Sequence, residues 1–265
     1  MKLNKLMFRE YDIRGIWNED ITEEVSYYIG RAYATKLLSL KKNKMIVGYD
    51  NRLSSPIIEK NLVKGLTDGG VDVVRLGLVT TPMYYYAWDK LNIHCGIMIT
   101  ASHNPKEYNG FKMSYNGIHN CFGNEVAELY YIILNGIYSK GNGSITDANI
   151  KEDYIKMINS HINMGSNKLK VIYDCGNGTT SIVAKDIFVS NDNIEYIPLF
   201  AESDGTFPNH HPDPAVESNL TILKEKVKEL NADCGIAFDG DGDRVGVVNE
   251  KGEFVSIDKF MVIIW

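Results

Sequence analysis

The sequence predicts an α/β protein with two consecutive mixed or mostly parallel sheets, each sandwiched by helices. The first observation is that short apolar runs, typical of buried strands, alternate with segments whose apolar residues recur at helical spacing. The second is that several polar loops directly follow a predicted strand. The third is a Gly-rich, polar stretch at residues 139–147, which is a candidate linker between two such series. Ligands in such sheets gather beyond the carboxyl ends of the strands, so we expect a site in these loops.

In the first half, strands are predicted at residues 45–49, 71–76, 95–99 and 110–114. Thr22 is a candidate N-cap, and Glu23 and Glu24 follow it where the helix dipole favours acids. Further helices are predicted at residues 56–69, 83–91 and 124–138. The second half predicts helices at 149–161 and 220–230 and strands at 171–174, 195–199, 234–238 and 245–248.

Two loops of the second half have no clear chemistry. The Gly-rich turn at residues 175–180 could cradle a phosphate, but it lacks the spacing of a Walker loop or a dinucleotide fingerprint. We interpret it as a structural turn that leads into another helix. The loop at residues 204–219 is long for a compact domain, and long ordered loops tend to be functional. Its adjacent His210 and His211 are weak evidence for a metal.

Composition excludes several classes of function. The chain has 265 residues, 44% hydrophobic and 23% charged, as expected for a soluble globular protein of two domains. Its 28 basic and 34 acidic residues give a net charge of −6, which argues against nucleic acid or an anionic membrane as the main partner. No apolar run approaches a membrane span and the N-terminus lacks a signal-peptide core, so we expect a cytoplasmic location. The four cysteines show no paired spacing, which favours free thiols.

The first stretch with chemistry surrounds Ser102. A short apolar run ends in Ser102, His103 and Asn104, and Pro105 prevents the strand from continuing. A small hydroxyl held where a strand stops is a common site for transient covalent chemistry. An ordinary polar turn explains this stretch alone equally well. Likewise Arg14, taken alone, is best explained by a structural pair with an Asp, and Lys112 by a surface lysine.

The second stretch is the run Asp239, Asp241 and Asp243, in which glycines separate the carboxylates. Three carboxylates this close would repel one another, and a divalent cation resolves the repulsion. A calcium EF-hand is set aside because its sixth position is Arg244 rather than Gly and because strands flank the loop. Few carboxylates and hard oxygen ligands suit Mg²⁺ acting on a phosphate. A solvated acidic turn is the remaining alternative.

Taken together, these stretches resemble the α-D-phosphohexomutase superfamily, over essentially the whole chain. Residues 100–105 are similar to its phosphoserine loop and residues 239–244 to its metal-binding loop. Residues 11–15 and 109–113 resemble the phosphomannomutase/phosphoglucomutase branch more than the phosphoglucosamine branch.

The resemblance implies roles for individual residues. Ser102 would carry the phosphoryl group. Mg²⁺ would be held by an oxygen of that phosphoserine and by Asp239, Asp241 and Asp243. The remaining site residues would be His103 lining the site, Lys112 as general acid or base, Arg14 for charge support and Arg244 orienting the phosphoserine or substrate.

The resemblance also implies a reaction and a domain plan. Phosphate would move between O6 and O1 of a mannose or glucose phosphate through a hexose bisphosphate. Residues 1–146 would form domain I, 147–252 domain II and 253–265 the truncated start of domain III. Since domains III and IV recognise the sugar and the distal phosphate, the chain alone is expected to be inactive or weakly active.

Three alternatives stay open. The chain could be a phosphoprotein or binding module that complements a separate C-terminal half. It could act on glucosamine phosphate, or it could be a Mg²⁺-dependent phosphatase in which the phosphate on Ser102 is lost to water.

Overall fold

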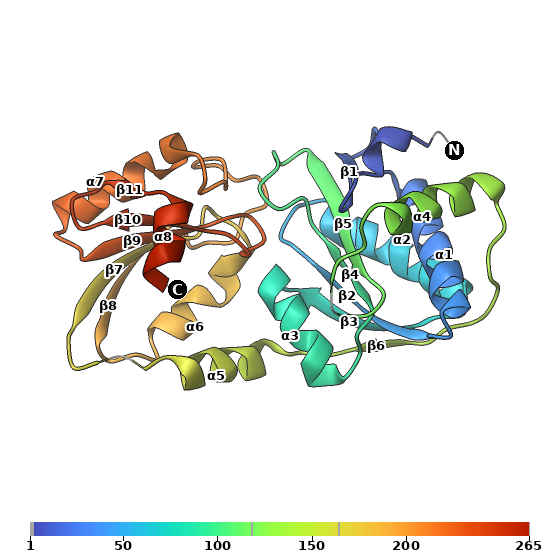
Figure 1. Cartoon of the computed structure of the whole chain (residues 1–265), viewed down its shortest axis with the longest axis horizontal. Coiled ribbons are helices and arrows are strands. Elements are labelled where there is room, and N and C mark those ends of the chain that lie inside the picture. Colours follow the sequence, from blue (N-terminus) through green and yellow to red (C-terminus); the bar gives the residue numbers. More distant parts are fainter. Residues whose placement is uncertain (1–2, 118, 164, 265) are drawn as a thin grey trace. The chain divides into compact units, whose positions relative to one another are not determined.

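The computed structural model describes residues 3–117, 119–163 and 165–264, and the chain divides into two compact units. Unit 1 comprises Met1–Ala101 and Lys106–Ile150, and unit 2 comprises Ser102–Pro105 and Lys151–Trp265. The short segment that carries Ser102 therefore clusters with unit 2, although unit 1 precedes and follows it in the sequence. Both units are α/β, as the sequence predicts (Figure 1).

The sheet of unit 1 has six strands in the order β1-β5-β4-β2-β3-β6. They are β1 (Ile13–Ile16), β2 (Lys44–Tyr49), β3 (Asp72–Leu78), β4 (Gly96–Ile99), β5 (Tyr108–Ser114) and β6 (Ile145–Asp147). All run parallel except β5, which is antiparallel to both β1 and β4. The four strands predicted for this half are confirmed as β2, β3, β4 and β5.

Two strands of this sheet were not expected. Residues 13–16, which contain an Arg and a Gly, form β1 because they pair with β5, with Ile13 opposite Phe111. The linker predicted at 139–147 is wrong in its last residues, because 145–147 form the exposed edge strand β6 and pair with β3. Neither strand has the apolar alternation that marks a strand in sequence.

The helices of unit 1 are α1 (Glu23–Ser39), α2 (Ser55–Asp68), α3 (Thr81–Leu91) and α4 (Asn124–Asn135), with a short 3-10 turn η1 (Lys5–Met7). The predicted cap is confirmed, since the Thr22 hydroxyl oxygen accepts the N–H of Val25 at 3.1 Å. Helix α1 packs against both α2 and α4 (Figure 1). Side chains of these helices share one core with Ile97 and Ile99 of β4, whose four residues are all buried. The strand that leads to Ser102 is thus firmly anchored.

Helices α1 and α2 touch through their backbones. A Cβ added to Gly65 would lie 2.1 Å from the carbonyl oxygen of Tyr27, and one added to Gly30 would lie 2.3 Å from that of Leu62. No side chain fits at either place, so both glycines set the distance between the helices.

The sheet of unit 2 has five strands in the order β11-β10-β9-β7-β8. They are β7 (Leu169–Asp174), β8 (Ile194–Leu199), β9 (Cys234–Phe238), β10 (Val245–Asn249) and β11 (Phe254–Val255). Strand β7 is parallel to β8 and β9, whereas β10 is antiparallel to β9 and β11. The acidic run at residues 239–244 is therefore the connection of the β9–β10 hairpin. It leaves β9 at the same edge of the sheet at which β7 ends.

The helical segments of unit 2 are α5 (Lys151–His161), η2 (Thr179–Ile182), α6 (Ala184–Phe188), η3 (Glu217–Leu220), α7 (Thr221–Glu229) and α8 (Ile257–Ile264). Ile172 packs with α7, whereas its neighbour Tyr173 packs with α6, so these helices cover opposite faces of the sheet (Figure 1). The helix predicted after the Gly-rich turn is present but short, as η2 and α6.

Two further expectations concern the whole chain. All four cysteines are free, as predicted: Cys95, Cys121, Cys175 and Cys234. Among the described residues, no helix is long and apolar enough to cross a membrane.

Substituting Gly65 by Ala tests the contact between α1 and α2. Helix propensity alone favours Ala over Gly by about 1 kcal/mol. The new methyl group would clash with the backbone of α1, so we expect a net loss of about 1–3 kcal/mol in the free energy of unfolding. Urea unfolding followed by circular dichroism measures this. Gly165→Ala is the control, because a Cβ there meets nothing within 4 Å. A Gly65→Ala variant as stable as the wild type would contradict the packing argument.

Candidate active site

Three carboxylates gather in the β9–β10 connection. Oxygen atoms of Asp239, Asp241 and Asp243 lie within 4.8 Å of one another, and in the described part of the chain this is the one group of three or more such ligands. Asp239 and Asp241 are buried, and Asp243 is exposed. Gly242 adopts a positive φ of 77°, which lets the connection turn back on itself. The three carboxylates converge as the sequence predicts.

Asp239 is fixed at both of its oxygens. Its Oδ1 accepts the backbone N–H groups of Asp243 at 3.0 Å and Arg244 at 2.9 Å. Its Oδ2 accepts the hydroxyl of Ser102 at 2.7 Å. Burial, and then the neighbouring carboxylates of Asp241 and Asp243, raise the pKa of Asp239 well above its ordinary range. A bound cation would remove this penalty, and a set of hard oxygen donors fits Mg²⁺.

Ser102 is held in a strained conformation. It is buried, and its φ of +52° lies in the left-handed region that a non-glycine residue seldom adopts. Such strain persists where surrounding structure enforces it, and it clusters at functional sites. The ring Nδ1 of His103 lies 3.3 Å from the Ser102 hydroxyl oxygen.

The segment Ser102–Pro105, called the serine loop below, also touches the connection at residues 239–244, called the acidic loop, through the backbone. A Cβ on Gly240 would lie 2.5 Å from the carbonyl oxygen of Ser102, so only glycine fits there. The sequence shows that glycines separate the carboxylates, but this contact was not predicted. A contact between residues so far apart in sequence leaves no local signal.

Arg14 and Lys112 lie in unit 1, on the paired strands β1 and β5. Arg14 is opposite Gly110, so it and Lys112 fall on the same face of the sheet. Arg14 Nη2 donates to Asp12 Oδ2 at 2.6 Å, which is the structural pair that the sequence favours for this residue taken alone. Their roles at a site stay predictions.

Arg244 is exposed and borders a hollow of about 590 Å³ in unit 2. The hollow lies where α8 meets β10 and β11, and Phe254, Ser256 and Met261 also line it. The side chain of Arg244 is therefore accessible to a ligand. The role predicted for it stays a prediction.

A buried network at the end of β2 was not predicted from the sequence. Arg52 is fully buried; its Nε donates to Asp50 Oδ2 at 3.1 Å and its Nη1 to the carbonyl oxygen of Tyr108 at 3.1 Å. The Ser55 hydroxyl donates to Asp50 Oδ1 at 2.7 Å. This network ties the loop after β2 to the start of β5. The sequence shows a polar loop there, but not that its charges are buried.

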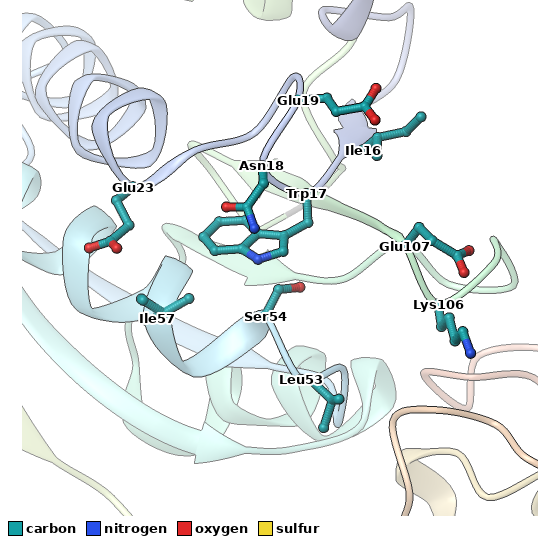
Figure 2. A pocket seen from close by; sticks show the side chains of 10 residues that line it. All are labelled: Ile16, Trp17, Asn18, Glu19, Glu23, Leu53, Ser54, Ile57, Lys106 and Glu107. Carbon is teal, nitrogen blue, oxygen red and sulfur yellow. The ribbon is translucent and has the colours of Figure 1, made fainter.

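A second hollow, of about 640 Å³, lies in unit 1. Figure 2 shows the indole of Trp17 at its centre, with Glu23 on one side and Lys106 and Glu107 on the other. Its lining residues are Ile16, Trp17, Asn18, Glu19, Glu23, Leu53, Ser54, Ile57, Lys106 and Glu107. No residue predicted for the site is among them.

The chain matches two family models. Residues 5–135 match phosphoglucomutase/phosphomannomutase, alpha/beta/alpha domain I, and residues 152–252 match alpha/beta/alpha domain II of the same family.

Curated relatives and a solved structure agree with these models. The chain is 45% identical over 258 residues to a phosphomannomutase/phosphoglucomutase of Pseudomonas syringae pv. tomato, covering 97% of this chain and 55% of that protein. It is 39% identical to a phosphoglucomutase of Neisseria meningitidis serogroup B, covering 97% and 56%. A crystal structure of a phosphoglucomutase/phosphomannomutase family protein from Burkholderia thailandensis superposes with a TM-score of 0.94 at 35% identity, covering 99% and 58%.

The chain thus spans about half the length of the curated relatives it matches. Two consecutive family models cover most of it, and they confirm the superfamily that the sequence resembles. The chain belongs to the phosphoglucomutase/phosphomannomutase family of the α-D-phosphohexomutase superfamily, and it contains that family's domains I and II.

Proposed function

We propose that this chain carries the phosphoryl-transfer centre of a hexose phosphate mutase of the phosphomannomutase/phosphoglucomutase kind. One observation supports this most strongly: the buried hydroxyl of Ser102 donates to Asp239, 137 positions away, in a cluster of three carboxylates. A hydroxyl beside a cation site is what phosphoryl transfer requires, since that chemistry depends on positioning and charge stabilisation. The names of the relatives support the same reaction.

In this proposal Ser102 is the phosphoryl carrier. The phosphoserine gives its phosphoryl group to the free hydroxyl of a hexose phosphate, which yields a hexose bisphosphate. The bisphosphate then returns its other phosphoryl group to Ser102 Oγ, so phosphate has moved between O6 and O1. Bound Mg²⁺ would neutralise charge on the group in transfer, and Asp239, Asp241, Asp243 and an oxygen of the phosphoserine would hold it.

The remaining residues act on protons and charge. Lys112 is proposed to take the proton of the attacking hydroxyl and to return one to the leaving oxygen. Arg14, on the same face of the sheet, supports the negative charge of the phosphate. His103, whose ring lies beside Ser102, lines the site, and Arg244 orients the phosphoserine or the substrate.

The domain plan belongs to the same proposal. Residues 1–146 are domain I, 147–252 domain II and 253–265 the opening of a third domain. Domains III and IV, on a C-terminal half, would complete the sugar and distal phosphate pockets; the chain's 55% coverage of a full-length relative supports this. The expected substrates are mannose and glucose phosphates in the cytoplasm.

Phosphorylation of Ser102 can be measured directly. We expect the chain incubated with Mg²⁺ and radiolabelled glucose 1,6-bisphosphate to retain label on a Ser102 peptide. Ser102→Ala should lower the labelling by about 100-fold or more, because it removes the oxygen that accepts the group. Ser190→Ala, at an exposed position, is the matched control. Equal labelling of the Ser102→Ala variant would disprove the carrier role.

Replacing Asp241 by Asn tests the cation site. The wild type should gain thermal stability when Mg²⁺ is added, because the cation binds the folded state. Asp241→Asn should lose most of this gain. In EDTA the variant should melt no lower than the wild type, since one repelling charge has gone. Asp192→Asn removes an equal charge from an exposed position and serves as the control. A full Mg²⁺-dependent gain in Asp241→Asn would contradict the site.

Mixing tests the need for a C-terminal half. We expect the chain alone to convert mannose 1-phosphate or glucose 1-phosphate very slowly. Adding the C-terminal half of the Pseudomonas syringae relative should raise the rate at least about tenfold, because it supplies the missing substrate contacts. Robust turnover by the chain alone, abolished by Ser102→Ala, would refute this requirement.

A further inference from the structure

The acidic loop is supported by two segments of unit 2 that have no role in the proposed chemistry. The backbone N–H of Thr179, in the Gly-rich turn after β7, donates to the carbonyl oxygen of Gly240 at 2.9 Å. A Cβ on Gly178 would lie 3.0 Å from that same oxygen. Pro212, in the loop before η3, has its Cγ 3.6 Å from the position of a Cβ on Gly240. Gly240 lies between Asp239 and Asp241, so these contacts restrain the backbone from which both carboxylates project.

A buried charged pair joins these two supporting segments. His210 Nε2 lies 3.1 Å from Oδ2 and 3.2 Å from Oδ1 of Asp174, the last residue of β7. Asp174 is 1% exposed, and its Oδ1 also accepts the N–H of Gly176 at 2.7 Å. His210 lies two positions before Pro212, and Asp174 lies five positions before Thr179. The pair therefore connects the loop that carries Pro212 to the Gly-rich turn that carries Thr179.

The geometry favours the charged form of His210. Its Nδ1 lies 2.9 Å from the carbonyl oxygen of His211, so both ring nitrogens face an oxygen that can only accept. A neutral imidazole has one N–H and can satisfy one acceptor, whereas the imidazolium satisfies both. Burial lowers the pKa of His210, but the hydrogen bond and charge of Asp174 outweigh it, so the pKa is raised.

We propose that His210 and Asp174 form a positioning pair for the acidic loop, and that protonation of His210 increases the affinity of this loop for a divalent cation. The proposal rests on the cation site of the proposed function. The protonated pair keeps Pro212 and the Gly-rich turn against Gly240. Loss of the proton leaves a single N–H for two buried acceptors, so either the carboxylate of Asp174 or the carbonyl of His211 loses its donor, which loosens the support.

The direction of the pH effect follows from the groups that face His210. These are the carboxylate of Asp174 from β7, the carbonyl of His211 and the ring of Phe200, whose centroid lies 5.3 Å away. Because the folded pKa is raised, the support is complete at low pH and is lost as the pH rises through that pKa. Carboxylates alone give the opposite trend, since they bind cations better as the pH rises.

The first test is calorimetric titration of the full chain with Mn²⁺ between about pH 6 and about pH 9, the range in which a histidine with a raised pKa loses its proton. The wild-type affinity should fall about three- to tenfold across this range, less than the effect of groups that contact metal ligands directly. His210→Gln should bind more weakly at low pH and show no such fall. His211→Gln keeps the carbonyl that His210 uses and should follow the wild type. Equal profiles for wild type and His210→Gln would overturn the proposal.

The second test needs no variant. By linkage, if protonation strengthens cation binding, cation binding must increase the proton affinity of His210 by the same factor. The pKa of His210 is then higher with the cation bound. An NMR titration of the His210 ring with and without Mg²⁺ measures this. Direct repulsion between the cation and the imidazolium predicts a lowered pKa, so the sign separates the two effects. An unchanged or lowered pKa would overturn the positioning role. A wild type that binds neither Mn²⁺ nor Mg²⁺ would instead refute the cation site itself, and the pair's role with it.

Discussion

Mutual repulsion among Asp239, Asp241 and Asp243 is the constraint on which the architecture of unit 2 depends. Burial raises the energetic cost of that repulsion, so the fold must hold the loop in place. It does so from several directions. Backbone N–H groups at positions 243 and 244 orient Asp239, Thr179 holds the peptide of Gly240, and Ser102 donates from a strained backbone. The loop itself leaves β9 at the edge of the sheet where the parallel strand β7 also ends, and in α/β folds ligand sites form beyond such strand ends.

The serine loop shows how one residue is positioned by two kinds of support. Strand β4, directly before it, is buried along its whole length in the core of unit 1. The loop itself contacts the acidic loop in unit 2, through the hydroxyl of Ser102 and through its carbonyl oxygen against Gly240. The role proposed for Ser102 would need no catalytic triad, because phosphoryl transfer gains most from alignment and charge.

The sequence was sufficient for elements with strong local signals. Apolar runs located β2, β4, β7 and β9, and the cap at Thr22 located the start of α1. It also identified the Ser102 stretch and the aspartate run, because unusual residue types stand close together there. Strands β1 and β6 were missed because pairing partners distant in sequence create them. The contacts of Gly240 and the pair of His210 with Asp174 are equally non-local, so no sequence pattern marked them.

The most direct test of the account is a single-turnover chase of the phosphorylated chain. Phosphoserine protein would be isolated and supplied with the C-terminal half of the Pseudomonas syringae relative, Mg²⁺ and glucose 6-phosphate. The fate of its phosphoryl group would be followed by ³¹P NMR. A phosphoryl carrier should transfer the group to the sugar, so glucose 1,6-bisphosphate should form in step with the loss of phosphoserine. Release of inorganic phosphate at the same rate with and without sugar, and no bisphosphate, would contradict the account and identify a phosphatase.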